Sequence, residues 1–302
     1  MSKTTSTPKQ KAKIDTHDHH HDHTHAPSIL GENVKFEITI PWKEVQKAYA
    51  RALQDIASTA ELKGFRKGKA PLKLVEEKVG KTKIYEESVS RVLSPAYTEE
   101  IKKRGIRPIV EPHVHPKSLE EEKDWVFEVE TAEAPEVKVA GYKEKVLEKK
   151  AKTNIILPGK DEKPATEDEK LRTIFQILLE HTNVRVPEIL VRNETSQALS
   201  RLVEQLDRLH VTLEDYVKST QKTIESLRQE YAVSALTSLQ LEFILAEISK
   251  EEKLEVTDKE IDDIVAAMPD ENLRKTSQMP GQRAYIASTL LRRKTVEFLL
   301  AL

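Results

Sequence analysis

The sequence predicts an α+β protein in which a small N-terminal unit of helices and strands precedes a mostly α-helical unit. Strand-like alternation of apolar and polar residues is confined to the N-terminal half, in residues 34–40 and 125–131. From residue 171 onward the apolar residues instead recur at helical spacing. Charged residues make up 33% of the chain and aromatic residues only 5%, which favours long solvated helices over one large compact barrel.

The 302 residues are long enough for two or three domains with cores of their own. We expect a disordered, His-rich tail over residues 1–33, because no buried face can be drawn through it. The α+β unit follows over 34–134, then a linker over 135–170, then the helical unit over 171–302.

Composition excludes several classes of protein. The chain has no cysteine, so disulfides and thiol catalysis are excluded and an oxidising compartment is not implied. The N-terminus is polar and lacks the apolar segment of a signal peptide. We also expect no apolar run long enough to span a bilayer, and hence a soluble, cytoplasmic protein with no membrane partner.

Each element of the N-terminal unit has a local cause. Pro41 ends the first strand and presets the first turn of a helix that runs to about Leu62. Pro71 opens a short helix that Gly80 closes. A longer helix then runs to Gly105, and Pro95 inside it should kink it, because proline removes a backbone hydrogen bond. The remaining predicted elements are extended segments over 108–116 and 125–131.

The C-terminal unit is predicted to be helical throughout. Apolar residues at 171, 174, 175, 178 and 179 follow helical spacing without error. Thr212 and Thr257 each precede an acidic residue at the third following position, as in a capping box, and so predict helix starts. A long helix is expected from about Ile224 to Ser249, a loop between Pro269 and Pro280, and a final helix to the C-terminus.

A basic loop is expected between the first two helices. It is Lys63-Gly64-Phe65-Arg66-Lys67-Gly68-Lys69, four cations and no acid in seven residues. The two glycines allow a tight turn with φ > 0. Such a tip suits a polyanion, because Lys and Arg near phosphates release counterions, while Phe65 offers an apolar or stacking anchor. Local composition leaves open a basic turn with Phe65 tucked into a local core.

The distribution of charge supports a polyanionic partner for the N-terminal unit. Residues 34–117 carry 18 Lys and Arg against 11 Asp and Glu, a surplus of seven, although the whole chain has a net charge of −2. The rest of the chain therefore sums to −9. A basic module joined to an acidic remainder indicates that one part meets a polyanion and the other does not.

Two groups of histidines could suggest a metal site. The tail places six within nine positions, close enough to bind Ni²⁺, Zn²⁺ or Cu²⁺: His17, His19, His20, His21, His23 and His25. A purification tag or a solvated tail remains the alternative. His113 and His115 share one face of a predicted strand, but without a third ligand at useful spacing we expect them to be solvated edge residues.

The basic loop, with Pro71 just beyond it, resembles the signature loop of the trigger factor family, ribosome-associated bacterial chaperones. The likeness extends to distant segments and covers most of residues 34–148 and 171–302. The segments that carry it are Val34-Lys-Phe-Glu-Ile-Thr-Ile40, Trp125-Val-Phe-Glu-Val129, Val186-Pro-Glu-Ile-Leu-Val191, Leu213-Glu-Asp-Tyr216, and Ser288-Thr-Leu-Leu-Arg-Arg-Lys294 with Phe298-Leu-Leu300.

The resemblance implies a chaperone that needs no ATP or other cofactor and binds unfolded nascent polypeptides at the tunnel exit of the large ribosomal subunit. It also implies a homodimer away from the ribosome. The implied ribosome-binding residues are Gly64, Phe65, Arg66, Lys67, Gly68 and Lys69.

One departure from the family pattern concerns its enzyme domain. Full-length members carry a prolyl isomerase domain between the two parts, yet here only 23 residues separate Leu147 from Leu171. A stable domain below about 40 residues normally needs disulfides or metal. The isomerase domain is therefore expected to be absent, and no catalytic residues are predicted. The rival functions are a prolyl isomerase, a module that binds free RNA, and a metal-handling chaperone without ribosome docking.

Overall fold

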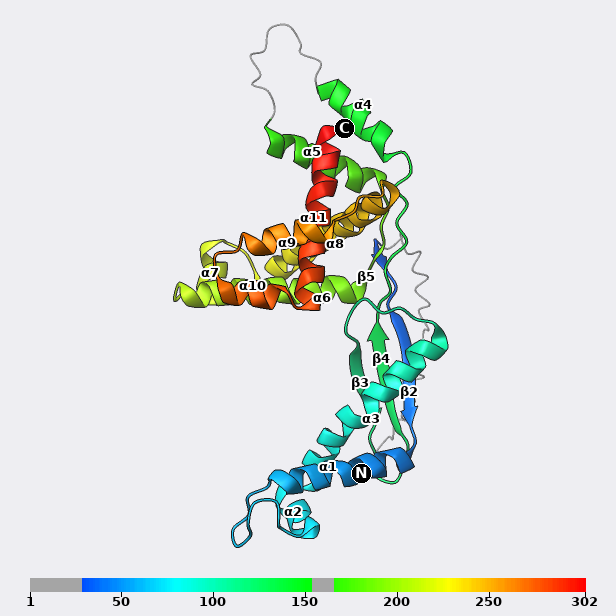
Figure 1. Ribbon diagram of the computed structural model, residues 1–302, viewed down its shortest axis with the longest axis vertical. Coiled ribbons are helices and arrows are strands. Elements are labelled where there is room, and N and C mark those ends of the chain that lie inside the picture. Colours follow the sequence, from blue (N-terminus) through cyan, green and yellow to red (C-terminus); the bar gives the residue numbers. More distant parts are fainter. Residues whose placement is uncertain (1–28, 154–165) are drawn as a thin grey trace, which may run out of the picture.

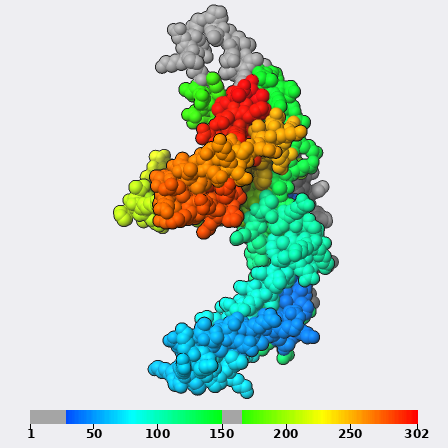
Figure 2. Space-filling model, viewed as in Figure 1, coloured from blue at the N-terminus to red at the C-terminus, as the bar shows by residue number. Residues whose placement is uncertain are grey.

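The computed structural model describes residues 29–153 and 166–302. The molecule is elongated, with the α+β unit at one end and the helical body at the other (Figure 1). An arm of the helical body and the helices of the N-terminal unit project toward the same side. The space-filling view shows a hollow between them (Figure 2). The predicted order, an α+β unit followed by a helical one, is confirmed.

The N-terminal unit is a three-stranded antiparallel sheet packed against helices. The strands are ordered β2-β4-β3. The predicted alternation sets the β2–β4 register, because Phe36 pairs with Val129 and Ile38 with Phe127, placing apolar residues together on the buried face. The elements are β2 (Val34–Ile40), α1 (Trp42–Thr59), α2 (Leu72–Val79), α3 (Lys81–Arg104), β3 (His113–Ser118) and β4 (Trp125–Thr131).

A second, smaller core lies beneath the connection between α1 and α2. Its members come from α1, α2 and α3, and the fully buried ones include Ala52, Val75 and Ile84. Tyr49 of α1 also donates a hydrogen bond to Glu76 of α2, at 2.7 Å. These contacts hold α1 and α2 in place as a base for the loop that joins them.

The helical body is built as the spacing predicts. Its main core gathers buried residues from several helices, among them Ile174, Leu178, Ile244 and Leu299. The capping box at Thr257 is present, and Thr212 caps its helix through the backbone N–H of Asp215. The helices are α5 (Glu167–His181), α6 (Glu188–Arg208), α7 (Leu213–Ser219), α8 (Ile224–Glu251), α9 (Asp258–Ala266), α10 (Glu271–Ser277) and α11 (Pro280–Ala301).

Three segments differ from the prediction. Residues 30–33, placed in the tail, include β1 (Leu30–Gly31), which pairs with β5 (Val186–Pro187) of the helical body. The linker contains α4 (Tyr142–Thr153), a helix because Tyr142 and Val146 bury themselves in the body core. The loop expected between Pro269 and Pro280 contains α10, which Asp270 caps. The six tail histidines and the loop residues 154–165 lie outside the described residues.

The long helix α8 corrects a further expectation. By length and composition, α8 could cross a membrane, although no such run was predicted. The core helix of a soluble protein meets the same criteria, and α8 contributes Ile244 and Ile248 to the body core. Only 28% of its most apolar window is buried, however. Of its large apolar side chains, Ile224 and Val233 are exposed, at 58% and 60%.

Candidate functional site

The basic loop lies at one extremity of the molecule, between α1 and α2 (Figure 1). Three backbone hydrogen bonds give it a defined shape. Phe65 N–H donates to Leu62 O at 3.0 Å, Gly68 N–H to Ala60 O at 3.2 Å, and Lys69 N–H to Arg66 O at 2.9 Å. The loop is therefore a folded turn, and its hydrogen-bonded backbone sets the positions from which the side chains project.

Both loop glycines have the positive φ that the sequence predicts, but for different reasons. Gly64 has φ 90° and lies in open space. Gly68 has φ 72°, and a Cβ there would lie 2.6 Å from the carbonyl oxygen of Ser58, closer than real Cβ atoms approach. Gly68 is thus required by both its backbone conformation and its contact with the end of α1.

The loop presents its side chains to solvent. Phe65 is 43% exposed, so it is not tucked into a local core. Lys63, Arg66, Lys67 and Lys69 are all exposed. Lys67 lies 3.4 Å from Glu61, a contact between two well-exposed side chains that stabilises little. Of the six predicted site residues, Gly64, Phe65, Arg66, Lys67 and Lys69 are exposed, and Gly68 is half-buried against the end of α1.

The strand histidines form no metal site. His113 Nδ1 lies 3.3 Å from Arg192 Nη2, so this ring faces a cation. Among residues 29–153 and 166–302, no group of three or more His, Cys, Asp and Glu side chains could hold a metal ion.

The helical body carries exposed apolar side chains that were not predicted residue by residue. Six large apolar side chains there are more than half exposed: Leu209, Ile224, Val233, Leu273, Met279 and Tyr285. Several helices have more apolar residues than one buried face requires, and this is the signal in the sequence for exposed apolar side chains. Helical periodicity does not say which of these residues face solvent.

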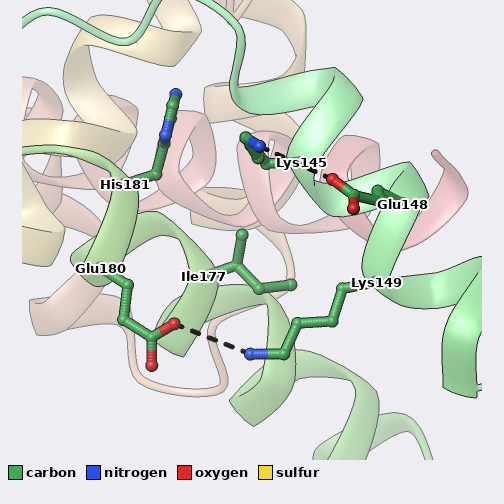
Figure 3. Close-up of a pocket in the computed structure, with 6 residues that line it drawn as sticks. All are labelled: Lys145, Glu148, Lys149, Ile177, Glu180 and His181. Atoms are coloured by element: carbon green, nitrogen blue, oxygen red, sulfur yellow. Dashed lines mark ion pairs between the residues drawn. The ribbon is translucent and has the colours of Figure 1, made fainter.

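A pocket of about 320 Å³ lies between α4 and α5 (Figure 3). Its charged side chains form two ion pairs: Lys145 lies 3.6 Å from Glu148, and Lys149 lies 3.7 Å from Glu180. The ring of His181 lies 3.0 Å from the carbonyl oxygen of Ala140. The pocket is therefore lined by two ion pairs and by a His181 ring that contacts the backbone.

The fold resembles that of a solved chaperone. The matching structure comes from a study titled "Promiscuous Substrate Recognition in Folding and Assembly Activities of the Trigger Factor Chaperone". The match has a TM-score of 0.57 and covers 89% of this chain and 97% of that one, at 15% sequence identity. The arrangement of an α+β unit and a helical body is thus shared with a chaperone.

Two family models identify the family. The model of the bacterial trigger factor protein matches residues 26–155, and that of the trigger factor C-terminus matches residues 138–301. The chain therefore belongs to the trigger factor family.

Curated relatives are similar over part of their length. Trigger factor from Staphylococcus carnosus (strain TM300) is 28% identical over 191 residues, which are 63% of this chain and 38% of that protein. Trigger factor from Staphylococcus epidermidis (strain ATCC 12228 / FDA PCI 1200) is 35% identical over 112 residues, 37% of this chain and 26% of that protein. This chain thus spans well under half the length of these relatives.

Proposed function

We propose that this protein is an ATP-independent cytoplasmic chaperone that docks on the large ribosomal subunit and shelters unfolded nascent chains. The observation that supports docking is the exposed basic loop around Phe65, held in shape at one end of the molecule. Ribosomal RNA offers the phosphates for its cations. Arg and aromatic side chains carry much of the energy of interfaces, so Phe65 and Arg66 are the natural anchors.

The exposed apolar side chains of the helical body support the binding of unfolded chains. An unfolded chain has apolar residues of its own, and contact with these exposed side chains removes apolar area of both from water. Release needs no nucleotide, because a client that folds buries its own apolar surface and loses the reason to bind. The hollow between the arm and the N-terminal unit offers space for such a chain (Figure 2).

The protein should not catalyse prolyl isomerisation. The match to the N-terminal family model ends at residue 155, and the match to the C-terminal one begins at residue 138. Because the two matches overlap, no residues between them are left for an enzyme domain. A proline-peptide assay tests this proposal. Acceleration well beyond the uncatalysed relaxation of roughly tens to hundreds of seconds would contradict it.

Docking is tested with the triple variant Phe65→Ala, Arg66→Ala, Lys67→Ala. We expect it to stop co-sedimenting with ribosomes, because it loses two cations and the aromatic anchor, while its melting temperature stays close to that of the wild type. The wild type should also bind less as salt rises. A triple variant that still pellets with ribosomes would show that the loop is not the docking element.

A gel shift with naked ribosomal RNA distinguishes ribosome docking from general RNA binding. The basic surplus of residues 34–117 alone would favour any RNA. We expect much tighter binding to intact ribosomes, since Phe65 needs a specific apolar partner. Equal affinity for both would support the RNA-binding alternative.

A further inference from the structure

The N-terminal unit and the helical body meet at a small polar joint. Within the part of the chain that the structure describes, no helix of the body packs broadly against the sheet or against α1–α3. The two parts are connected at the β1–β5 pair, where Leu30 lies beside Val186, and through residues 133–138, which have no regular structure. Small interfaces of this kind leave relative motion as the default.

A buried carboxylate, Glu130, stands at the centre of the joint. It lies on β4, and its side chain is only 8% exposed. Arg192 of α6 donates to its Oε2 at 2.5 Å, while Asn33 donates to Oε1 at 2.9 Å and Lys35 lies 3.0 Å from Oε1. Burial alone would raise the pKa of Glu130, but these bonds outweigh it and lower the pKa to about 2.

Asn33 ties the two parts together a second time. Its Oδ1 accepts a hydrogen bond from the backbone N–H of Ile189 at 2.9 Å. Ile189 lies in the first turn of α6, and the N-cap residue Pro187 provides no side-chain cap. Asn33 therefore satisfies a free N–H of a helix in the body while its amide group binds Glu130 of the sheet.

We propose that Glu130, Arg192 and Asn33 form a latch that holds one angle between the two parts, and that its release lets the helical body pivot. The pivots are Glu32, between β1 and β2, and residues 133–136, because Val137 already packs against the body core. Without Arg192, the buried charge of Glu130 would lose one of its bonding partners, which is unfavourable. A half-open joint is therefore disfavoured relative to one in which the contact is intact or in which Glu130 is released to solvent. Pivoting would change the width of the hollow seen in Figure 2.

The latch can be tested without any ribosome or client, so its failure is distinguishable from failure of the proposed function. The chain has no cysteine, so two added cysteines can be spin-labelled cleanly. Gln54→Cys on α1 and Ser200→Cys on α6 place labels at exposed positions on either side of the joint. Pulsed electron spin resonance then measures the distance distribution in the otherwise intact chain.

We expect one narrow distribution in the labelled parent. Glu130→Gln and Arg192→Gln should each broaden it and shift its mean. The double variant should resemble the single ones, since one broken partner already releases the latch. If Glu130→Gln lowers the melting temperature of the sheet, Arg192→Gln still decides the question, because the Arg192 side chain is 41% exposed and its loss leaves no cavity in a core.

A matched control is Arg292→Gln. Arg292 Nη2 donates to Glu242 at 2.9 Å, a contact between α11 and α8 inside the helical body. Its loss should leave the distribution unchanged. The proposal is overturned if Arg192→Gln retains the narrow parental distribution, or if Arg292→Gln broadens it equally.

Discussion

The N-terminal unit and the helical body differ in how far their large apolar side chains are exposed to solvent. Within residues 34–134, no large apolar side chain is more than 45% exposed, and Phe65 is among the few that reach 43%. In the helical body six exceed half, led by Leu209 at 71% and Tyr285 at 68%. The first unit is a closed core with a charged tip, whereas the second keeps apolar surface in water.

This difference shows how one chain can serve two kinds of partner. A charged tip suits a polyanionic surface, because its cations release counterions from phosphates and its backbone is already held in shape by hydrogen bonds. Scattered exposed apolar groups suit partners of many sequences, since burial of apolar area is not directional. The comparison predicts that changes in the two regions have separate consequences.

The largest change in the free energy of unfolding should come from a substitution in the buried core of the N-terminal unit. Trp125 is 1% exposed and lies against Tyr85 and Phe127, with ring centroids 5.6 and 6.4 Å away. Trp125→Ala should lower the free energy of unfolding of the N-terminal unit by about 3–5 kcal/mol. Phe65→Ala should change it by only about 0.5 kcal/mol. Urea unfolding followed by circular dichroism measures both, and equal losses would show that Phe65 belongs to a core.

A smaller effect should follow from substituting the two loop glycines. Gly68→Ala must push its Cβ away from the Ser58 carbonyl as well as adopt positive φ, so we expect a loss of more than about 2 kcal/mol. Gly64→Ala meets no atom within 4 Å and should cost about 1–2 kcal/mol from its φ alone. Neither variant changes charge.

Ribosome co-sedimentation of the glycine variants separates shape from charge. Gly68→Ala should bind less than Gly64→Ala, because only Gly68→Ala must move the backbone that carries the cations. Identical binding by both variants and the wild type would mean that charge alone, without loop shape, accounts for docking.

The dependence of stability on pH probes the junction between the two regions. The pKa of Glu130 is lowered to about 2 from an ordinary value of 4.5. A lowered pKa means that the stabilisation is fully present above about 4.5 and is lost as pH falls toward 2. Glu130→Gln should be less stable at neutral pH, and its stability should fall less over that interval. Parallel curves for variant and wild type in urea titrations from pH 5 to 2 would contradict this assignment.

The smallest effect on folding and chaperoning should come from removing the histidine tail. We expect calorimetry to show that Ni²⁺ binds the full chain and not a version that starts at Ile29, because six imidazoles lie in nine positions. Both versions should suppress aggregation equally. His113→Gln with His115→Gln is the matched control and should keep Ni²⁺ binding. Equal Ni²⁺ binding by the full and shortened chains would refute a metal site in the tail.

Local rules in the sequence were sufficient for most of the fold. Alternation in residues 34–40 predicted β2 and its buried face, and Thr257 predicted the start of α9, because strand pleat and helix capping depend on near neighbours. The turn at Gly64 and Gly68 was predictable for the same reason. The helix at 142–153 was missed because its cause is distant: Tyr142 packs in the body core and donates to Glu252 at 2.8 Å.

The joint and the exposed apolar surface could not be predicted from local pattern. Glu130 looks like an ordinary polar residue of an alternating strand, and its burial depends on Arg192, 62 residues later, and on Asn33, 97 residues earlier. Val233 likewise occupies a helix with more apolar residues than its core needs. Which of them face water depends on how α8 packs against α6 and α11.

The central claim is that the loop and the helical body act separately. One measurement tests it: ribosome co-sedimentation and suppression of aggregation of an unfolded client, on the same preparations of two triple variants. The loop variant is Phe65→Ala, Arg66→Ala, Lys67→Ala, and the body variant is Leu209→Ser, Val233→Ser, Tyr285→Ser. We expect the loop variant to lose ribosome binding and keep aggregation suppression, and the body variant to do the reverse. Loss of both activities in either folded variant would contradict the separation.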